Sequence, residues 1–252
     1  MSMNVIDVRN LSFSYNGVDV LKDISFAVHG EDYVGLAGPN GSGKTTLLKA
    51  LLGIVAPARG VVRLFDHELN DFRDWHKIGY LPQKLNAFNP HFPSTVREIV
   101  ALGLISKRTF SGRLDKADRM AIDRTLERLH ILDIGDSLIG ELSGGQQQRV
   151  LIARAIVHKP EIVILDEPAS ALDPDTREHF FSILRDLNRA DHATVILVTH
   201  DIGSIGQHAG KLLYIDRKVI FYGSFDDFCR SENMAALFGG NAQHIICHQH
   251  DR

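Results

Sequence analysis

The chain has 252 residues, of which 44% are hydrophobic and 23% are charged, and these are ordinary values for a globular protein. Its 28 Lys and Arg against 31 Asp and Glu give a formal net charge of −3, which does not favour a general affinity for nucleic acid. With two cysteines and no run of about 18 apolar residues, the sequence predicts neither a disulfide scaffold nor a membrane-spanning helix of its own.

The first part of the chain is predicted to form strands. Residues 11–15 alternate between apolar and polar side chains, and the alternation resumes after Asn16-Gly17, which is a strong hairpin signal. A short apolar run at 33–37 then predicts a strand that leads through a glycine-rich loop into a helix at about 45–52.

The middle of the chain is predicted to be helical. Thr95 and Glu98 have capping-box spacing, and residues 116–129 carry apolar side chains at near-helical intervals. The α/β pattern resumes afterwards, because 162–165 and 195–198 are continuous apolar runs of the kind that buried parallel strands show. Residues 212–222 are expected to form a closing hairpin.

The loop after the strand at 33–37 predicts a phosphate-binding site. It fits the pattern G-x-x-x-x-G-K-[ST], where glycines let backbone N–H groups converge on phosphate oxygens and a helix N-terminus follows. The lysine would reach the β- and γ-phosphates, and the threonine after it would ligate Mg²⁺. The loop consists of Gly38, Pro39, Asn40, Gly41, Ser42, Gly43, Lys44 and Thr45, with Thr46 next in the chain.

Two carboxylates end the apolar run at 162–165, where Asp166 is followed by Glu167. Adjacent strand residues point to opposite faces, so we expect one carboxylate at the shell of the metal and the other facing the attacking water. Together with the phosphate loop, this pair predicts hydrolysis of a nucleoside triphosphate.

A second candidate anion site is Ser143-Gly144-Gly145-Gln146. Ser143 and Gln146 have the spacing of a helix N-cap and its third residue, and the helix is expected to extend over 147–158 and end before Pro160. Glycines in the first turn weaken a helix but leave its N-terminus accessible to an anion.

At this point the sequence resembles the ATP-binding cassette (ABC) ATPases. Residues 143–146 look like the signature motif of that family, Tyr15 like its adenine-stacking aromatic residue, and Gln83 like its Q-loop glutamine. Residues 170–173, which end in Asp173, resemble the D-loop, and His200 resembles the switch histidine. Counting the phosphate loop, six motifs follow one another along the chain in the order that the family shows, and the match covers about residues 5–225.

The resemblance implies an α/β fold. It has a P-loop NTPase core with a mainly parallel sheet, an antiparallel β subdomain at the N-terminus and an inserted α-helical subdomain. A single ABC ATPase domain is expected over 1–252, with the core at about 1–86 and 150–225, the helical subdomain at about 87–149 and a tail at 226–252.

The resemblance also implies how the protein works. Two copies would form a head-to-tail homodimer in the ATP-bound state, in which each nucleotide lies between one phosphate loop and the signature of the other copy. Glu167 would be the general base, His200 would bridge the γ-phosphate and the opposite copy, and Gln83 would join the Mg²⁺ shell. ATP and Mg²⁺ are the expected ligands, with Thr45, Gln83 and Asp166 toward Mg²⁺. The nucleotide-binding set is Tyr15, residues 38–46, Ser143, Gly144, Gly145, Gln146 and Asp173.

Residues 91–104 and the tail resemble the ATPases of metal-cation importers for zinc, manganese or iron. That resemblance implies integral membrane permease subunits, an external substrate-binding protein and a peripheral location on the cytoplasmic face of the membrane. Apolar Leu85, Phe88 and Phe92 suit a docking surface or the interior of the helical subdomain. The tail carries His244, Cys247, His248 and His250, which suit a metal ion or simply a solvated segment.

Two alternative functions remain open. The chain could energise import of another substrate, or it could be a soluble ABC ATPase that acts as an assembly factor without a membrane partner. A GTPase is disfavoured because no Asn-Lys-x-Asp run occurs, and a DNA-repair role is disfavoured because no long heptad insertion occurs.

Overall fold

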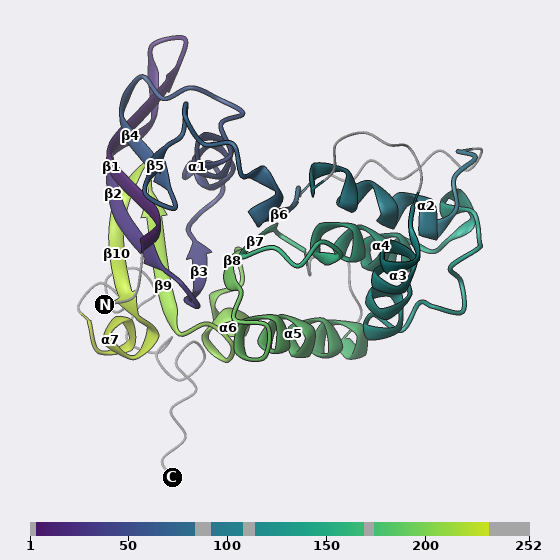
Figure 1. Cartoon of the computed structure of the whole chain (residues 1–252). Coiled ribbons are helices and arrows are strands. Elements are labelled where there is room, and N and C mark those ends of the chain that lie inside the picture. Colours follow the sequence, from purple (N-terminus) through teal and green to yellow (C-terminus); the bar gives the residue numbers. More distant parts are fainter. Residues whose placement is uncertain (1–3, 84–91, 108–113, 169–173, 232–252) are drawn as a thin grey trace. The chain divides into compact units, whose positions relative to one another are not determined.

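The computed structural model describes residues 4–83, 92–107, 114–168 and 174–231 (Figure 1). The chain divides into two compact units. The first is built from residues 1–73 and 194–252, and the second from residues 74–193. No helix among the described residues is long and apolar enough to cross a membrane.

An antiparallel sheet in the order β2-β1-β4-β5 opens the first unit. Strands β1 (Asn4–Tyr15) and β2 (Val18–His29) pair around Asn16-Gly17, whose φ angles are +48° and +79°, so the predicted hairpin is confirmed. Strand β4 (Arg59–Leu64) pairs with β1, and the short β5 (His67–Glu68) pairs with β4.

Parallel strands also run through the first unit. Strand β3 (Tyr33–Ala37) lies parallel to both β8 (Thr194–Val198) and β9 (Lys211–Asp216). Every residue of β3 and β8 is buried, which explains their continuous apolar runs. Strand β10 (Lys218–Ser224) returns antiparallel to β9 and completes the predicted closing hairpin.

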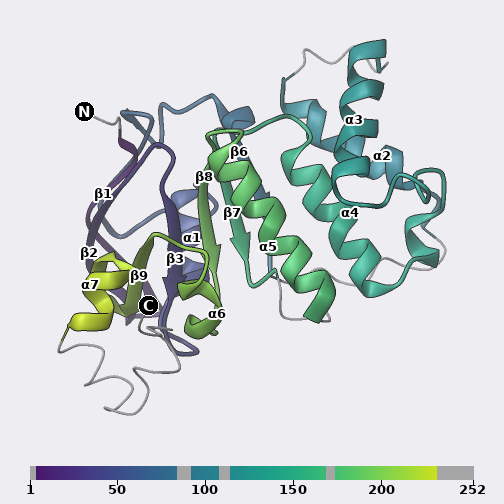
Figure 2. The same ribbon diagram turned by 90° about the horizontal axis from the view of Figure 1, so that it is seen from below.

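The described residues of this unit form the helices α1 (Lys44–Leu51), α6 (Ile202–Gly206) and α7 (Phe225–Arg230). Helix α7 was not predicted, because it is too short to show helical periodicity. Ser224 caps it by accepting a hydrogen bond from the backbone N–H of Asp227. Its Phe228 is fully buried and lies against the rings of Tyr214 and Phe221 beside β9 and β10 (Figure 2).

The described residues of the second unit include a parallel strand pair and several helices. A 3₁₀ helix, η1 (Trp75–Lys77), leads into β6 (Ile78–Leu81), which pairs in parallel with β7 (Ile162–Asp166). A Cβ at Gly79 would lie 2.2 Å from the carbonyl oxygen of Ala155, so β6 and helix α4 (Gly144–Ile156) approach closely.

Helix α4 packs against α2 (Val96–Ala101) and α3 (Lys116–Arg128), as Figures 1 and 2 show. The 3₁₀ helices η2 (Leu102–Lys107) and η3 (Ile139–Glu141) join them, and α5 (Pro174–Arg189) follows β7. The predicted capping box is confirmed, because Thr95 and Glu98 exchange hydrogen bonds with each other's backbone N–H groups. Between residues 92 and 143, the described segments contain helices and only an isolated bridge between Thr95 and Leu138.

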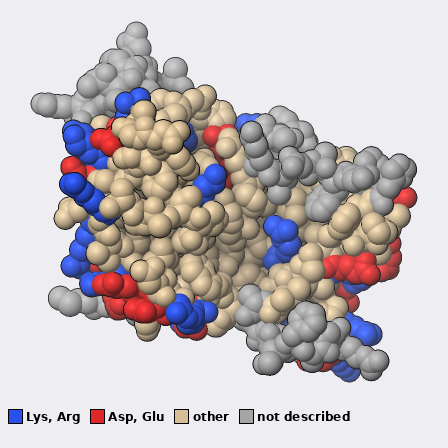
Figure 3. Space-filling view, turned by 90° about the horizontal axis from the view of Figure 1, so that it is seen from above, with Lys and Arg blue, Asp and Glu red and all other residues tan. Residues whose placement is uncertain are grey.

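Small groups of cationic and anionic side chains are scattered over the face in Figure 3, with uncharged residues between them. Parallel strands, buried apolar runs and helices together agree with the α/β class predicted from the sequence.

Candidate nucleotide site

The loop between β3 and α1 needs its glycines. Gly38 and Gly43 have φ angles of +154° and +98°, a region that L side chains rarely adopt. A Cβ at Gly38 would lie 2.1 Å from the carbonyl oxygen of Ile215, and a Cβ at Gly43 would lie 2.5 Å from Leu21 Cδ2. Gly41, with φ of +80°, has no heavy atom within 4 Å of such a Cβ. Packing therefore requires glycine at positions 38 and 43. At Gly41, in the open tip of the loop, the positive φ angle favours glycine but packing does not require it.

Backbone hydrogen bonds hold the loop in place. The N–H of Arg217, in the turn between β9 and β10, donates to the carbonyl of Ser42 over 3.0 Å. The carbonyl of Arg217 in turn accepts from the N–H of Lys22 over 2.7 Å. Just before the loop, the N–H of Thr199 donates to the carbonyl of Leu36 over 3.1 Å. Neighbouring strands thus fix the loop from both sides.

Several groups at this loop suit a phosphate. The Lys44 side chain, only 7% exposed, donates from Nζ to the carbonyls of Gly38 (2.7 Å) and Pro39 (2.9 Å). Helix α1 has no side-chain cap and no acidic residue in its first turn. Its N-terminal N–H groups and the positive end of its dipole are therefore directed at the loop without a competing carboxylate.

Ser42 is the clearest sign that the loop takes a ligand. The residue is 1% exposed, and its Oγ has no hydrogen-bond partner among the described residues. A buried hydroxyl without a partner costs about 1–3 kcal/mol, so such a group normally has one. A phosphate oxygen would accept this hydrogen bond, and the loop therefore fits the triphosphate that the sequence predicts.

The other predicted residues of this unit lie at strand ends. Tyr15 ends β1 at the hairpin tip, where it is half exposed and its ring centroid lies 4.8 Å from that of Phe13. His200 is exposed and follows β8, whose register pairs Val198 with Leu36 of β3. His200 and the phosphate loop thus leave adjacent parallel strands at the same edge. Thr45 and Thr46 lie in the first turn of α1 and are half-buried.

The predicted acids and the predicted glutamine come together in the second unit. Leu81 pairs with Leu165 in the parallel β6–β7 register, so Gln83 and Asp166 leave the strands at a common edge. Asp166 is 2% exposed, whereas Gln83 is exposed. The pKa of Tyr80 is raised mainly by burial and, to a smaller extent, by the nearby Asp166 carboxylate. Tyr80 was not singled out from the sequence, because one tyrosine in a short strand carries no pattern.

The structure corrects the strand argument for Glu167. Strand β7 ends at Asp166, and Glu167 has a φ of +50°, so it is not an extended residue that alternates with Asp166. Glutamate is rarely found in this left-handed region, where the strain is about 1–2 kcal/mol. Strain of this kind tends to mark functional positions, and it sets the direction of this side chain independently of the strand.

The second predicted anion site is an exposed helix end. Ser143 caps α4, and it and Gln146 exchange hydrogen bonds with each other's backbone N–H groups, as predicted. The helix was expected over 147–158, but it begins at Gly144 and ends at Ile156. It begins early because Ser143 is its N-cap, so the helix starts at the next residue. A Cβ at Gly144 or Gly145 would have no heavy atom within 4 Å, so packing requires neither glycine.

Gln147 was missed by the sequence reasoning. Its Nε2 donates to the carbonyls of Ile139 (3.0 Å) and Leu142 (3.3 Å), which anchors the segment that leads into the signature residues. A run of three glutamines offers no local signal for which of them turns inward.

Some predicted residues lie outside the described part of the chain. They are Asp173, the apolar Leu85 and Phe88, and the tail residues His244, Cys247, His248 and His250. Among the described residues, no group of three His, Cys, Asp or Glu side chains is arranged to hold a metal ion.

Comparisons with known proteins extend over most of the chain. The sequence model of the family described as "ABC transporter" matches residues 21–170. The zinc uptake system ATP-binding protein ZurA of Listeria innocua is 44% identical over 224 residues, which cover 89% of this chain and 87% of ZurA. The manganese transport system ATP-binding protein MntB of Halalkalibacterium halodurans is 34% identical over 237 residues, or 94% and 93% of the two chains.

A solved structure confirms the predicted fold. It is a dimeric ATP-binding cassette in a post-hydrolysis state, bound to ADP and Pi, and it matches with a TM-score of 0.77 at 30% identity. The match covers 87% of this chain and 98% of that one.

Replacing Ser42 by Ala separates ligand binding from folding. We expect Ser42→Ala to keep or raise the unfolding temperature without nucleotide, since it removes a buried hydroxyl that has no partner. The rise in unfolding temperature on adding ATP should shrink, and a tenfold weaker affinity would remove about 1.4 kcal/mol of that stabilisation. Thermal unfolding with and without ATP measures both effects.

Ser25→Ala is the matched control, because Ser25 lies on β2 and hydrogen-bonds to Asn10 instead. If ATP stabilised Ser42→Ala as much as the parent, the Ser42 hydroxyl would not contact the nucleotide.

Proposed function

The chain belongs to the ABC transporter family, and we propose that it is the ATP-hydrolysing subunit of an importer that moves a metal cation (zinc, manganese or iron) through separate membrane subunits. The phosphate loop with its unpartnered Ser42 supports the nucleotide part of the proposal. The metal part is supported by similarity to zinc and manganese uptake proteins over nearly the whole chain.

Each predicted residue has a role in this proposal. The phosphate loop and the N-terminus of α1 bind the phosphates, and Lys44 exchanges its two loop carbonyls for phosphate oxygens. Tyr15 offers an exposed ring on which adenine stacks. Glu167 accepts a proton from the attacking water, and His200 contacts the γ-phosphate from the edge of β8.

The hydroxyl of Thr45, the amide of Gln83 and the carboxylate of Asp166 are hard oxygen donors, the kind that Mg²⁺ prefers. Mg²⁺ would neutralise charge on the phosphates. The burial of Asp166 keeps that carboxylate away from bulk water, which strengthens its attraction for a cation.

We place the signature residues opposite the phosphate loop of a second copy. Ser143 and Gly144 are exposed, and no heavy atom lies near a Cβ at either glycine. Bare backbone at a helix N-terminus lets a second molecule approach closely and directs N–H groups toward an anion. The similar cassette is dimeric, which supports a pairing of two copies. The D-loop residue Asp173 is assigned to this interface from the family resemblance.

Gly145→Ala tests the dimer directly. Because the added methyl group meets no heavy atom within 4 Å in the chain itself, we expect the variant to fold normally. Its methyl group should obstruct the other copy and weaken ATP-dependent dimerisation roughly tenfold, given a steric cost of about 1–3 kcal/mol. Analytical ultracentrifugation in ATP measures this in a Glu167→Gln background, which retains the nucleotide.

Gly210→Ala, at an equally open position between α6 and β9, should dimerise like the parent. If Gly145→Ala dimerises equally well, the signature glycines do not face a second copy.

Glu167→Gln tests the general base. Removing the carboxylate while keeping the size of the side chain should slow ATP hydrolysis by roughly 10²–10⁴-fold and leave ATP binding unchanged. Steady-state phosphate release and ATP-induced thermal stabilisation measure the two quantities. Glu161→Gln, at the opposite end of the same strand, is the matched control, and its near-normal turnover is expected. Near-full turnover in Glu167→Gln would remove it from the catalytic role.

Permease subunits and a peripheral location on the cytoplasmic face of the membrane complete the proposal. Phe92, Leu102 and Ile105 expose 41%, 50% and 51% of their surface in the second unit. We assign them to the permease contact, because exposed apolar groups at neighbouring sequence positions favour an interface. A separate external binding protein would deliver the cation. One ABC ATPase domain over 1–252, with a helical subdomain at about 87–149 and a tail at 226–252, is the domain organisation that we propose.

Uptake measurements in cells that lack this chain test the transport function. We expect accumulation of radioactive zinc, manganese or iron to fall, to recover with the intact chain and not to recover with Lys44→Ala, which lacks the phosphate-loop ammonium. Uptake of an amino acid in the same cells controls for general loss of membrane energisation. Unchanged uptake of all three ions would contradict metal import. If the chain also failed to co-purify with an integral membrane protein, the soluble assembly-factor alternative would stand.

A further inference from the structure

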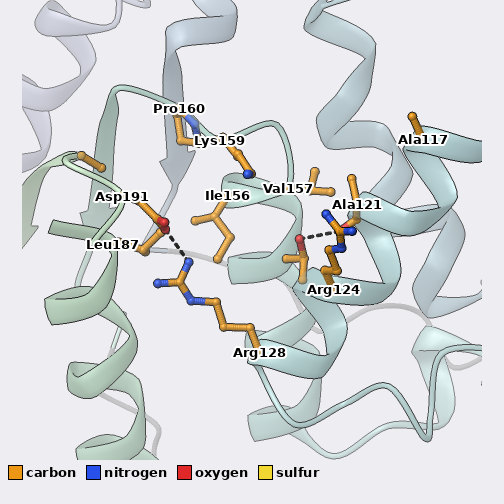
Figure 4. A pocket seen from close by; sticks show the side chains of 12 residues that line it. Ala117, Ala121, Arg124, Arg128, Ile156, Val157, Lys159, Pro160, Leu187 and Asp191 are labelled. Atoms are coloured by element: carbon orange, nitrogen blue, oxygen red, sulfur yellow. Dashed lines mark hydrogen bonds and ion pairs between the residues drawn. The ribbon is translucent and has the colours of Figure 1, made fainter. Parts of the chain in front are cut away.

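A cavity lies entirely within the unit formed by residues 74–193. It has a volume of about 600 Å³, which is in the usual range for small-molecule sites. Helix α3 forms one wall, and the turn after α4 and the C-terminal end of α5 form the others (Figure 4). None of the residues predicted to bind nucleotide or Mg²⁺ lines it.

Apolar side chains form the inner surface of this cavity. Ile156 and Val157 at the end of α4 and Leu187 on α5 are buried and lie against it. On the α3 wall, Ala117 and Ala121 contribute only methyl groups, which leaves the space between the helices open. This surface suits a ligand with an apolar body.

Cations outnumber anions around the cavity. Arg124, Arg128 and Lys159 line it together with a single carboxylate, Asp191. Arg128 uses Nη1 to contact Asp191 Oδ2 over 2.5 Å, which joins α3 to the segment after α5 (Figure 4). Within the described residues, no hydrogen bond or ion pair engages the side chains of Arg124 and Lys159. Two positive charges therefore remain for a ligand.

The backbone at Lys159 adds an independent observation. Its φ is +53°, in the left-handed region where glycine or asparagine usually ends a helix, and Pro160 follows directly. A lysine held here is strained by about 1–2 kcal/mol. Glycine would relieve that strain, but it would remove the cation from the cavity.

We propose that this cavity binds a small amphipathic anion. Its phosphate or carboxylate contacts Arg124 and Lys159, and its apolar part lies on Ile156, Val157 and Leu187. An inorganic anion alone would leave the apolar surface uncovered, and a neutral apolar molecule would leave both cations without a partner. A bound ligand would join α3 to the end of α5, a span that the Arg128–Asp191 ion pair also bridges.

Displacement of a fluorescent dye tests the chemistry of the ligand. The probe is 1-anilinonaphthalene-8-sulfonate, itself an amphipathic anion, added to the full chain without nucleotide. Octyl phosphate and octanoate should displace it at lower concentration than inorganic phosphate or the neutral octyl glucoside, all below micelle formation. The tighter of the two anions identifies the head group. Equal displacement by octyl glucoside would overturn the proposal.

Two variants locate the binding site, with a third as control. Arg124→Gln and Lys159→Gly should each weaken octyl phosphate binding roughly fivefold, for the loss of one charge-assisted contact of about 1 kcal/mol. Lys159→Gly should be at least as stable as the parent in thermal unfolding, so weaker binding would not reflect unfolding. Arg119→Gln, on α3 but not at the cavity, should bind like the parent. Parental affinity in both Arg124→Gln and Lys159→Gly would overturn the proposal.

Discussion

The rest of the nucleotide site depends on how tightly the phosphate loop is enclosed by its neighbours. At Gly38 and Gly43 there is no room for a Cβ, because a strand carbonyl and a leucine side chain occupy that space. The loop therefore takes one path between β3 and α1, and its N–H groups are aligned before any ligand arrives. Alignment of this kind removes an ordering cost from binding. In the chain without a ligand, this fixed path leaves the buried hydroxyl of Ser42 without a hydrogen-bond partner among the described residues, which is unfavourable.

Parallel strands extend the same constraint to the other site residues. Because the carboxyl ends of parallel strands meet at one edge, β3 and β8 bring the phosphate loop and His200 together. In the second unit, β6 and β7 do the same for Gln83 and the acids. Within each unit, residues far apart in sequence become neighbours through strand register alone.

Local rules predicted much of this arrangement, and tertiary contacts account for what they missed. The Asn16-Gly17 hairpin and the capping boxes at Thr95 and Ser143 each depend on a few adjacent residues, so the sequence was sufficient. The left-handed backbone of Glu167 follows no local pattern, and the bond from Arg217 to Ser42 joins residues far apart in the chain. The inward turn of Gln147 depends on backbone carbonyls five and eight residues earlier. No pattern in a single sequence reports such contacts. The ABC family was recognised because its motifs are local and ordered.

The glycines near the candidate sites differ in whether packing within the chain requires them. Those at 38, 43 and 79 are required by atoms of the chain itself, whereas a Cβ at Gly144 or Gly145 would meet no heavy atom within 4 Å, so packing within the chain does not require them. Helix α4 begins at these two glycines and ends at the anion cavity, about 20 Å away along its axis. Between its ends, Val150, Ile152 and Ala153 are fully buried, so close packing holds the helix along its length. The two proposals, a ligand at Ile156 and a second copy at Gly144 and Gly145, therefore concern opposite ends of one closely packed helix.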